Sequence, residues 1–253
     1  MSTAASTGAI EPAQSAGQQA GVPLALKILT VITILGIAAG AVMALVYAGE
    51  DVTQGNVQRI FYFHVAAFAG AFVSFAVGVV GGILFLVKRN NRWDRIALAG
   101  VEVGFILALI NLFTGMIWAR PIWNTWWTWD PRLTSAAIMV LTYAAYFMLR
   151  AGIDNPDTRR RFASVYAILA FSTVIITFVI IRIRPDTIHP TVIGPSPQNA
   201  EGSFEMTSSM LATLSVSSFV WSVLVPITFI WWRVRLENLS DQVAALKART
   251  LKS

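Results

Sequence analysis

The stretch HVAAFAGAFVSFAVGVVGGILFLV, residues 64–87, decides the fold. It contains no Asp, Glu, Lys or Arg, and it is longer than the roughly 20 apolar residues that cross a membrane as a helix. Small residues such as Gly70, Gly78 and Gly82 recur inside it and suit close helix packing in lipid. The basic segment KRNNRWDR, residues 88–95, follows at once. The stretch therefore predicts a membrane-spanning helix that ends in a charged loop.

Further apolar runs lie on both sides of this stretch. The chain is 56% hydrophobic and only 13% charged, which excludes an ordinary soluble domain. The predicted fold class is an all-α polytopic membrane protein with six transmembrane helices. The predicted spans are 26–47, 64–87, 96–118, 133–149, 162–181 and 206–232.

The basic residues predict the orientation of these spans. Fourteen of the nineteen Lys and Arg lie at Lys27, in the loops 88–95 and 150–161, or after Trp232. The positive-inside rule therefore predicts that both termini are cytoplasmic. The net charge of +6 is explained by this topology and by anionic lipid, and it requires no nucleic-acid partner.

The predicted topology divides the chain into three parts. Residues 1–24 are rich in Ala, Ser, Gly and Gln and are expected to form a disordered cytoplasmic tail. Residues 25–232 are expected to form the membrane domain, with external loops at 119–132 and 182–205. Residues 233–253 are expected to form a cytoplasmic tail with a short amphipathic helix.

The first of these external loops contains a dense tryptophan cluster. The sequence WNTWWTWDPRLT, residues 123–134, has four tryptophans in seven positions. Tryptophans anchor helix ends at membrane interfaces, but one or two rings are enough for that purpose. If the segment is helical, Trp123, Trp126 and Trp127 share one face. This would form a flat aromatic shelf suited to a large, planar, apolar ligand.

The polar residues near this cluster have more than one interpretation. Asp130 precedes a proline, so it can cap the next helix, or it can contact a ligand directly. Arg132 can snorkel, pair with Asp130 or bind an anionic ligand group. Within the third span, Glu102 is a functional or interhelical candidate, and Asn111 can form an ordinary hydrogen bond between helices.

The chain has only two histidines, His64 and His189. The predicted topology places both at the outer face, together with the tryptophans. Neutral imidazole is a common ligand of iron, and paired axial histidines are a regular arrangement on a porphyrin. We therefore expect the two histidines to be axial ligands, although a lone histidine is more often structural.

The tryptophan motif resembles the WWD signature of the haem-handling proteins of cytochrome c biogenesis. RIFYFHVAAF (59–68) and DTIHPTVIG (186–194) resemble the regions around two external histidines in that group. Six spans, with one histidine on each side of the motif, are similar to the family of the cytochrome c maturation protein C (haem exporter protein C). Asn124 stands where the signature usually has glycine.

The resemblance implies the transient, non-covalent binding of haem b at the external side of the bacterial cytoplasmic membrane. His64 and His189 would be the axial ligands of the haem iron. The residues implied to contact the rest of the haem are Trp123, Trp126, Trp127, Trp129, Asp130 and Arg132.

The resemblance also implies partners. Haem would pass to a haem chaperone, the maturation protein E, with the ABC-type maturation proteins A and B and the small protein D as further partners. This is a role in positioning and transfer rather than clear catalysis. The alternatives are a transporter permease subunit, which predicts ionisable residues in several spans, and a haem-based electron-transfer protein, which predicts histidines at two depths.

Overall fold

The computed structural model of the chain describes residues 21–184, 186–190 and 206–250. These residues are nearly all helical and form no strand, apart from one isolated bridge between Asp51 and Gly55. The predictions for residues 1–20, 191–205 and 251–253 lie outside the described residues. The helices are α1 (Leu24–Val42), η1 (Met43–Tyr47), η2 (Asn56–Ile60), α2 (Phe61–Lys88), α3 (Asn91–Trp123), α4 (Pro131–Ala151), α5 (Pro156–Ile183), α6 (Ser208–Phe219), η4 (Val220–Leu224) and α7 (Val225–Thr250).

Six helical units are long and apolar enough to cross a membrane, which confirms the predicted all-α, six-span fold. They are Leu24–Tyr47, Asn56–Lys88, Asn91–Trp123, Pro131–Ala151, Pro156–Ile183 and Ser208–Thr250. Most helix bounds differ from the expected ones, and two of the differences change a predicted loop or tail. The third helix continues through Trp123, which shortens the predicted loop 119–132, and the last unit continues beyond residue 232 to Thr250.

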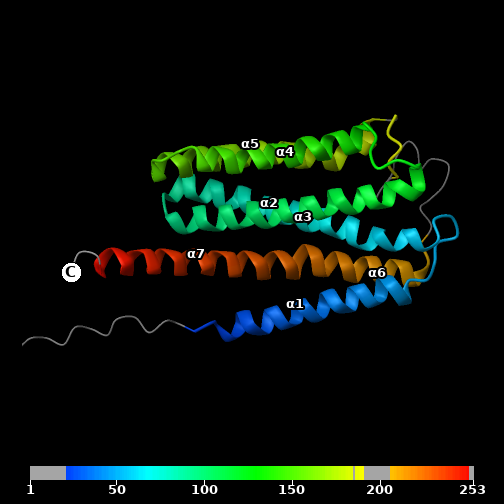
Figure 1. Ribbon diagram of the computed structural model, residues 1–253, viewed down its shortest axis with the longest axis horizontal. Helices are drawn as coiled ribbons and strands as arrows, with labels where there is room; N and C mark the ends of the chain where they lie inside the picture. The colour runs from blue at the N-terminus through cyan, green and yellow to red at the C-terminus, as the bar shows by residue number, and fades with distance from the viewer. Residues whose placement is uncertain (1–20, 185, 191–205, 251–253) are drawn as a thin grey trace, which may run out of the picture.

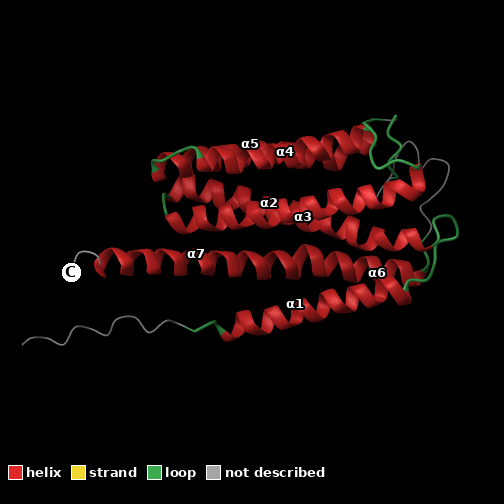
Figure 2. Ribbon diagram, in the orientation of Figure 1, coloured by secondary structure: helices red, strands yellow, loops and turns green. Residues whose placement is uncertain are grey.

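The helices α2 and α3 lie side by side at the centre of the bundle (Figure 1). The pair α4 and α5 packs on one side, and α1 with the continuous unit α6–η4–α7 packs on the other. The described loops join the helices at the two ends (Figure 2). A Cβ atom added to Gly100 would lie 2.8 Å from both the backbone oxygen of Ser74 and the backbone nitrogen of Gly78. Glycine therefore allows the backbones of α2 and α3 to touch, as in other membrane helix pairs.

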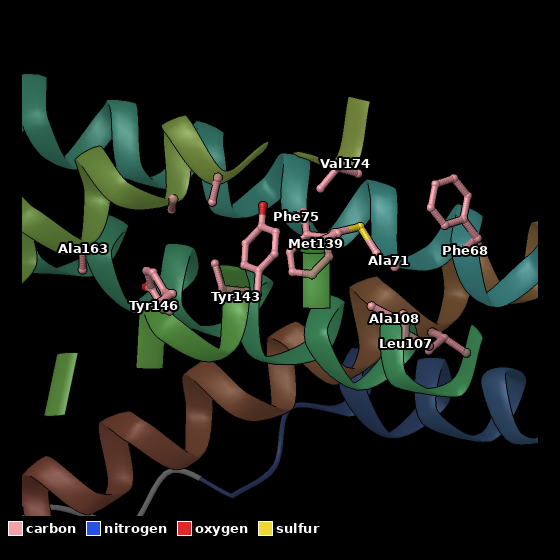
Figure 3. Close-up of a cluster of buried hydrophobic side chains, with 14 of the residues drawn as sticks. Phe68, Ala71, Phe75, Leu107, Ala108, Met139, Tyr143, Tyr146, Ala163 and Val174 are labelled. Atoms are coloured by element: carbon pink, nitrogen blue, oxygen red, sulfur yellow. The ribbon is translucent and has the colours of Figure 1, made fainter. Parts of the chain in front are cut away.

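A buried aromatic cluster joins α2, α4 and α5 (Figure 3). The rings of Phe75 and Tyr143 are stacked, with their centres 3.7 Å apart and their planes 15° from parallel. Met139 and Val174 lie beside them in the same cluster. This packing fixes the position of the α4–α5 pair relative to α2.

Ion pairs cluster near the end of the bundle where α2 ends and α3 begins. Asp94 accepts hydrogen bonds from Arg150, and Arg160 lies 3.7 Å from the same carboxylate. Further along α3, Glu102 pairs with Arg233 of α7 at 2.5 Å. Of the two interpretations of Glu102, the structure therefore shows the interhelical one. The two histidines lie toward the opposite end of the bundle, where α2 begins.

Candidate functional site

The two histidines are brought together by segments far apart in the sequence. His64 lies in the first turn of α2, and His189 lies in the loop that follows α5. The centres of their rings are 6.2 Å apart, and the ring planes are 33° from parallel. Their placement next to each other agrees with the prediction that both lie at one face.

A backbone carbonyl lies at the Nδ1 atom of each histidine. The Nδ1 atom of His64 is 2.9 Å from the carbonyl oxygen of Asn111, and that of His189 is 3.0 Å from the oxygen of Pro190. A carbonyl only accepts, so each Nδ1 carries the hydrogen and donates it. Each Nε2 atom then has a free lone pair. This is the usual arrangement of a metal-binding histidine.

His189 is suited to remaining neutral. Burial, the positive charge of Arg132 and the nearby His64 together lower the pKa of its imidazole to about 3. The neutral form is the one that binds a metal ion. The His189 side chain is therefore available as a ligand across the ordinary pH range.

Two adjoining cavities surround the histidine pair. One is small, about 70 Å³, and is roofed by Trp118, Trp123 and Trp127. The other is about 390 Å³ and runs along α2 and α5. Residues that line both cavities are His64, Val65, Asn111, Arg132, His189 and Pro190. The two cavities together form one mostly apolar slot, and both imidazoles lie in the lining that the cavities share.

The tryptophan motif does not continue as a helix. Helix α3 ends at Trp123, because Asn124 adopts the left-handed conformation with φ 55°, and residues 124–130 are irregular. The predicted aromatic shelf required Trp123, Trp126 and Trp127 to lie on one helix. Because the helix ends at Trp123, these three residues do not form that face. Trp126 and Trp129 are 54% and 79% exposed and line neither cavity.

A different set of rings forms the roof of the small cavity. Trp118 and Trp123 pack edge to face, with their ring centres 4.9 Å apart. The indole N–H of Trp118 donates to Gln54 at 2.8 Å, which ties the roof to the loop before α2. Trp127 completes the set. Trp118, Trp123 and Trp127 are called the tryptophan roof below.

Asp130 has two structural roles. Its Oδ2 atom accepts from the backbone N–H groups of Arg132 and Leu133, so it caps α4 as one of the two sequence interpretations proposed. Its Oδ1 atom accepts from the N–H of Ile188 at 2.9 Å. The same carboxylate therefore holds the loop that carries His189. Asp130 itself lines neither cavity.

Arg132 places a buried cation in the wall of the slot. Its guanidinium lies 4.6 Å from the centre of the Phe68 ring, and its Nη1 atom is buried without a hydrogen-bond partner. Within the described ranges, Arg132 forms no ion pair with an acidic side chain. The indole N–H of Trp127 is likewise buried and without a partner. The slot therefore offers two donors to an anionic or polar group.

The spacing of the histidines fits one metal ion between them. An imidazole centre lies about 1.1 Å behind its nitrogen, and metal–imidazole bonds are about 2 Å long, so two imidazoles on opposite sides of a metal have centres about 6 Å apart. The observed distance is 6.2 Å. In the described part of the chain, no three His, Cys, Asp or Glu side chains gather as a metal site. A metal held here would therefore need other ligands in its plane, as porphyrin iron has.

Comparison with known protein families gives an independent result. Residues 13–249, nearly the whole chain, match the family described as Heme exporter protein C. The chain belongs to the Heme exporter protein C family.

Individual relatives carry the same name. The Heme exporter protein C of Paracoccus denitrificans is 38% identical over 128 residues, which cover 49% of this chain and 53% of the relative. That of Rhodobacter capsulatus is 35% identical over 126 residues, with 50% and 52% covered. That of Bradyrhizobium diazoefficiens is 30% identical over 201 residues, with 79% and 74% covered. In the first two comparisons, the chain spans about half the length of the relative.

In this member of the Heme exporter protein C family, three residues at the site were not predicted from the sequence as site residues. Trp118 was not predicted as a site residue, and it forms part of the tryptophan roof. Asn111 forms the predicted hydrogen bond between helices, but its partner is His64, which the sequence did not indicate. Gly115 lines the small cavity beside the His64 ring. Asn111, Gly115 and Trp118 all lie on α3. Their spacing of four and three residues places them on one face of the helix, and this spacing could have indicated that they belong to the site.

Proposed function

We propose that this protein binds haem between His64 and His189 and presents it for transfer during the biogenesis of c-type cytochromes. The observation that carries the proposal is the pair of imidazoles, 6.2 Å apart, with a carbonyl at each Nδ1 atom. Family membership supports it, because the relatives are named as heme exporters. Haem is here the cargo, held without covalent attachment.

The remaining groups of the slot match the other parts of a haem molecule. The tryptophan roof and Phe68 supply apolar and aromatic surface for the porphyrin faces. The buried guanidinium of Arg132 is suited to a propionate, because a carboxylate would satisfy both its charge and its free N–H. Asp130 acts indirectly, because it holds the loop that carries His189.

The proposed partners follow from the family resemblance. Haem would pass to a membrane-anchored haem chaperone, the maturation protein E. The ABC-type maturation proteins A and B and the small protein D would then assist in release of the loaded chaperone. The proposed function is delivery of haem, because the slot contains hydrogen-bond donors and two potential iron ligands.

The direct test is purification of the full chain in mild detergent. We expect haem to copurify, with an absorption spectrum of six-coordinate, bis-imidazole iron and an iron-to-protein ratio approaching one when haem is supplied in excess. Bis-imidazole ligation is expected because the centres of the His64 and His189 rings are 6.2 Å apart. A chain that folds normally but binds no haem under these conditions would exclude this function.

The proposal also fixes the side of the membrane on which the slot opens. Reporter fusions after Arg89, Arg160 and Lys252 are expected to report the cytoplasm, because the basic loops remain inside. Fusions near Asn124 and Asn199 are expected to report the outside. If the Asn124 fusion reports the cytoplasm, the site does not lie at the external face.

A further inference from the structure

One turn of α3 surrounds the imidazole of His64. The Nδ1 atom lies 2.9 Å from the backbone oxygen of Asn111 and 3.3 Å from the hydroxyl of Thr114. That hydroxyl donates its own hydrogen to the backbone oxygen of Ile110 at 2.6 Å, so toward His64 it accepts. Both oxygens beside Nδ1 are therefore acceptors. They favour the tautomer of the neutral ring in which the hydrogen is on Nδ1.

The side chain of Asn111 holds His64 in a second way. Its Nδ2 atom donates to the backbone oxygen of His64 at 2.9 Å. Because that oxygen can only accept, the orientation of the amide is fixed. The same Nδ2 atom lies 3.2 and 3.4 Å from the two ring nitrogens. A group nearly equidistant from both lies over the ring, so it does not block the Nε2 lone pair.

Gly115 makes room for this arrangement. A Cβ atom added to Gly115 would lie 2.9 Å from the Cε1 atom of His64 and 3.3 Å from its Nδ1. Any side chain at this position would push the ring away from the carbonyl of Asn111. The imidazole therefore packs directly on the backbone of α3, at a distance that only glycine allows.

We propose that Asn111 is a positioning residue that presents His64 to the haem iron. The side chain of Asn111 ties α2 to α3 at the level of His64. The backbone carbonyl of Asn111 then holds the His64 ring in the tautomer with Nδ1 protonated. Free imidazole side chains favour the opposite tautomer, in which the Nε2 lone pair is lost. The proposal rests on the proposed function for the identity of the metal, but the tautomer is a property of the protein alone.

The presence of only two histidines makes the tautomer directly measurable. We expect the full chain, labelled with ¹⁵N-histidine and purified without haem in detergent, to show His64 with Nδ1 protonated and Nε2 bare. The His64→Ala variant assigns the signals. In Asn111→Leu, the His64 signals are expected to shift to a mixture of tautomers while those of His189 stay unchanged. If wild-type His64 carries its proton on Nε2, the proposal is overturned.

Ser74→Ala is the matched control, because Ser74 is a buried polar residue whose hydroxyl bonds only within α2. It is expected to leave both histidine signals unchanged. The haem affinity of Asn111→Leu should fall about 10- to 100-fold, as is typical when the partner of a metal ligand is lost. Unchanged signals and affinity in a normally folded Asn111→Leu would also refute the proposal.

Gly115→Ala provides a second variant in case Asn111→Leu does not fold. It retains the amide of Asn111 but displaces the ring, so it is expected to produce the same mixture of tautomers. If both variants retain the wild-type signals, Asn111 does not position His64. If the tautomer is as proposed but His64→Ala leaves the haem spectrum unaltered, the ligand assignment fails and the positioning stands.

Discussion

Replacement of both His64 and His189 by alanine is expected to abolish haem retention, although the tryptophan roof remains intact. Each single replacement is expected to weaken retention and to replace the bis-imidazole spectrum with that of iron bound by one imidazole. The reason is that the ring centres are 6.2 Å apart, which matches the spacing expected for two ligands of one metal. The measurement is the absorption spectrum and haem content of the purified variants.

Added imidazole separates a ligand from a structural residue. Loss of either side chain leaves a vacant volume beside the iron position, and free imidazole can enter it and restore much of the spectrum. A histidine that only stabilised the fold would instead reduce expression when replaced, and imidazole would not help. Wild-type spectra in both single variants would show that His64 and His189 are not the ligands.

The second large effect is expected when the tryptophan roof is replaced by leucine at Trp118, Trp123 and Trp127. Leucine keeps apolar surface but removes the flat aromatic faces. Aromatic pairing contributes about 1 kcal/mol per ring beyond burial, so three rings correspond to about 3 kcal/mol, or about a hundredfold in affinity. Haem titration in detergent measures the loss, and membrane insertion should remain normal.

The motif itself supplies the matched control. Trp126 and Trp129 belong to the same cluster, but they are exposed and line neither cavity. Replacement of both by leucine is expected to change haem affinity less than about threefold, well under the 1.4 kcal/mol of a tenfold change. Equal losses in the two sets of variants would mean that the cluster acts through membrane anchoring, without a dedicated roof.

Some features of the site could be predicted because their signals are local. The apolar runs needed only the length of a membrane span, and the cap at Asp130 needed only the Asp-Pro sequence. The charge distribution predicted that His64 and His189 lie at one face, and the two rings are neighbours in the structure.

Other features depend on contacts between distant segments. Which tryptophans face the cavity is decided by the left-handed turn at Asn124, and an asparagine can also continue a helix. The partner of Asn111 lies 47 positions away, so its role was indistinguishable from that of any polar residue in a span. Likewise, the bond from Ile188 to Asp130 joins positions 58 apart and has no sequence pattern.

The two bonds of Asp130 have a consequence for the motion of the His189 loop. Loss of a helix cap costs about 0.5–2 kcal/mol, and here the same carboxylate also secures the N–H of Ile188. The first turn of α4 and the His189 loop are therefore coupled, and they are expected to open together as one cooperative unit. Amide hydrogens at Leu133 and Ile188 would then exchange with solvent through a common opening event. We therefore expect the rate at which the loop moves His189 away to depend on how often the first turn of the transmembrane helix α4 opens.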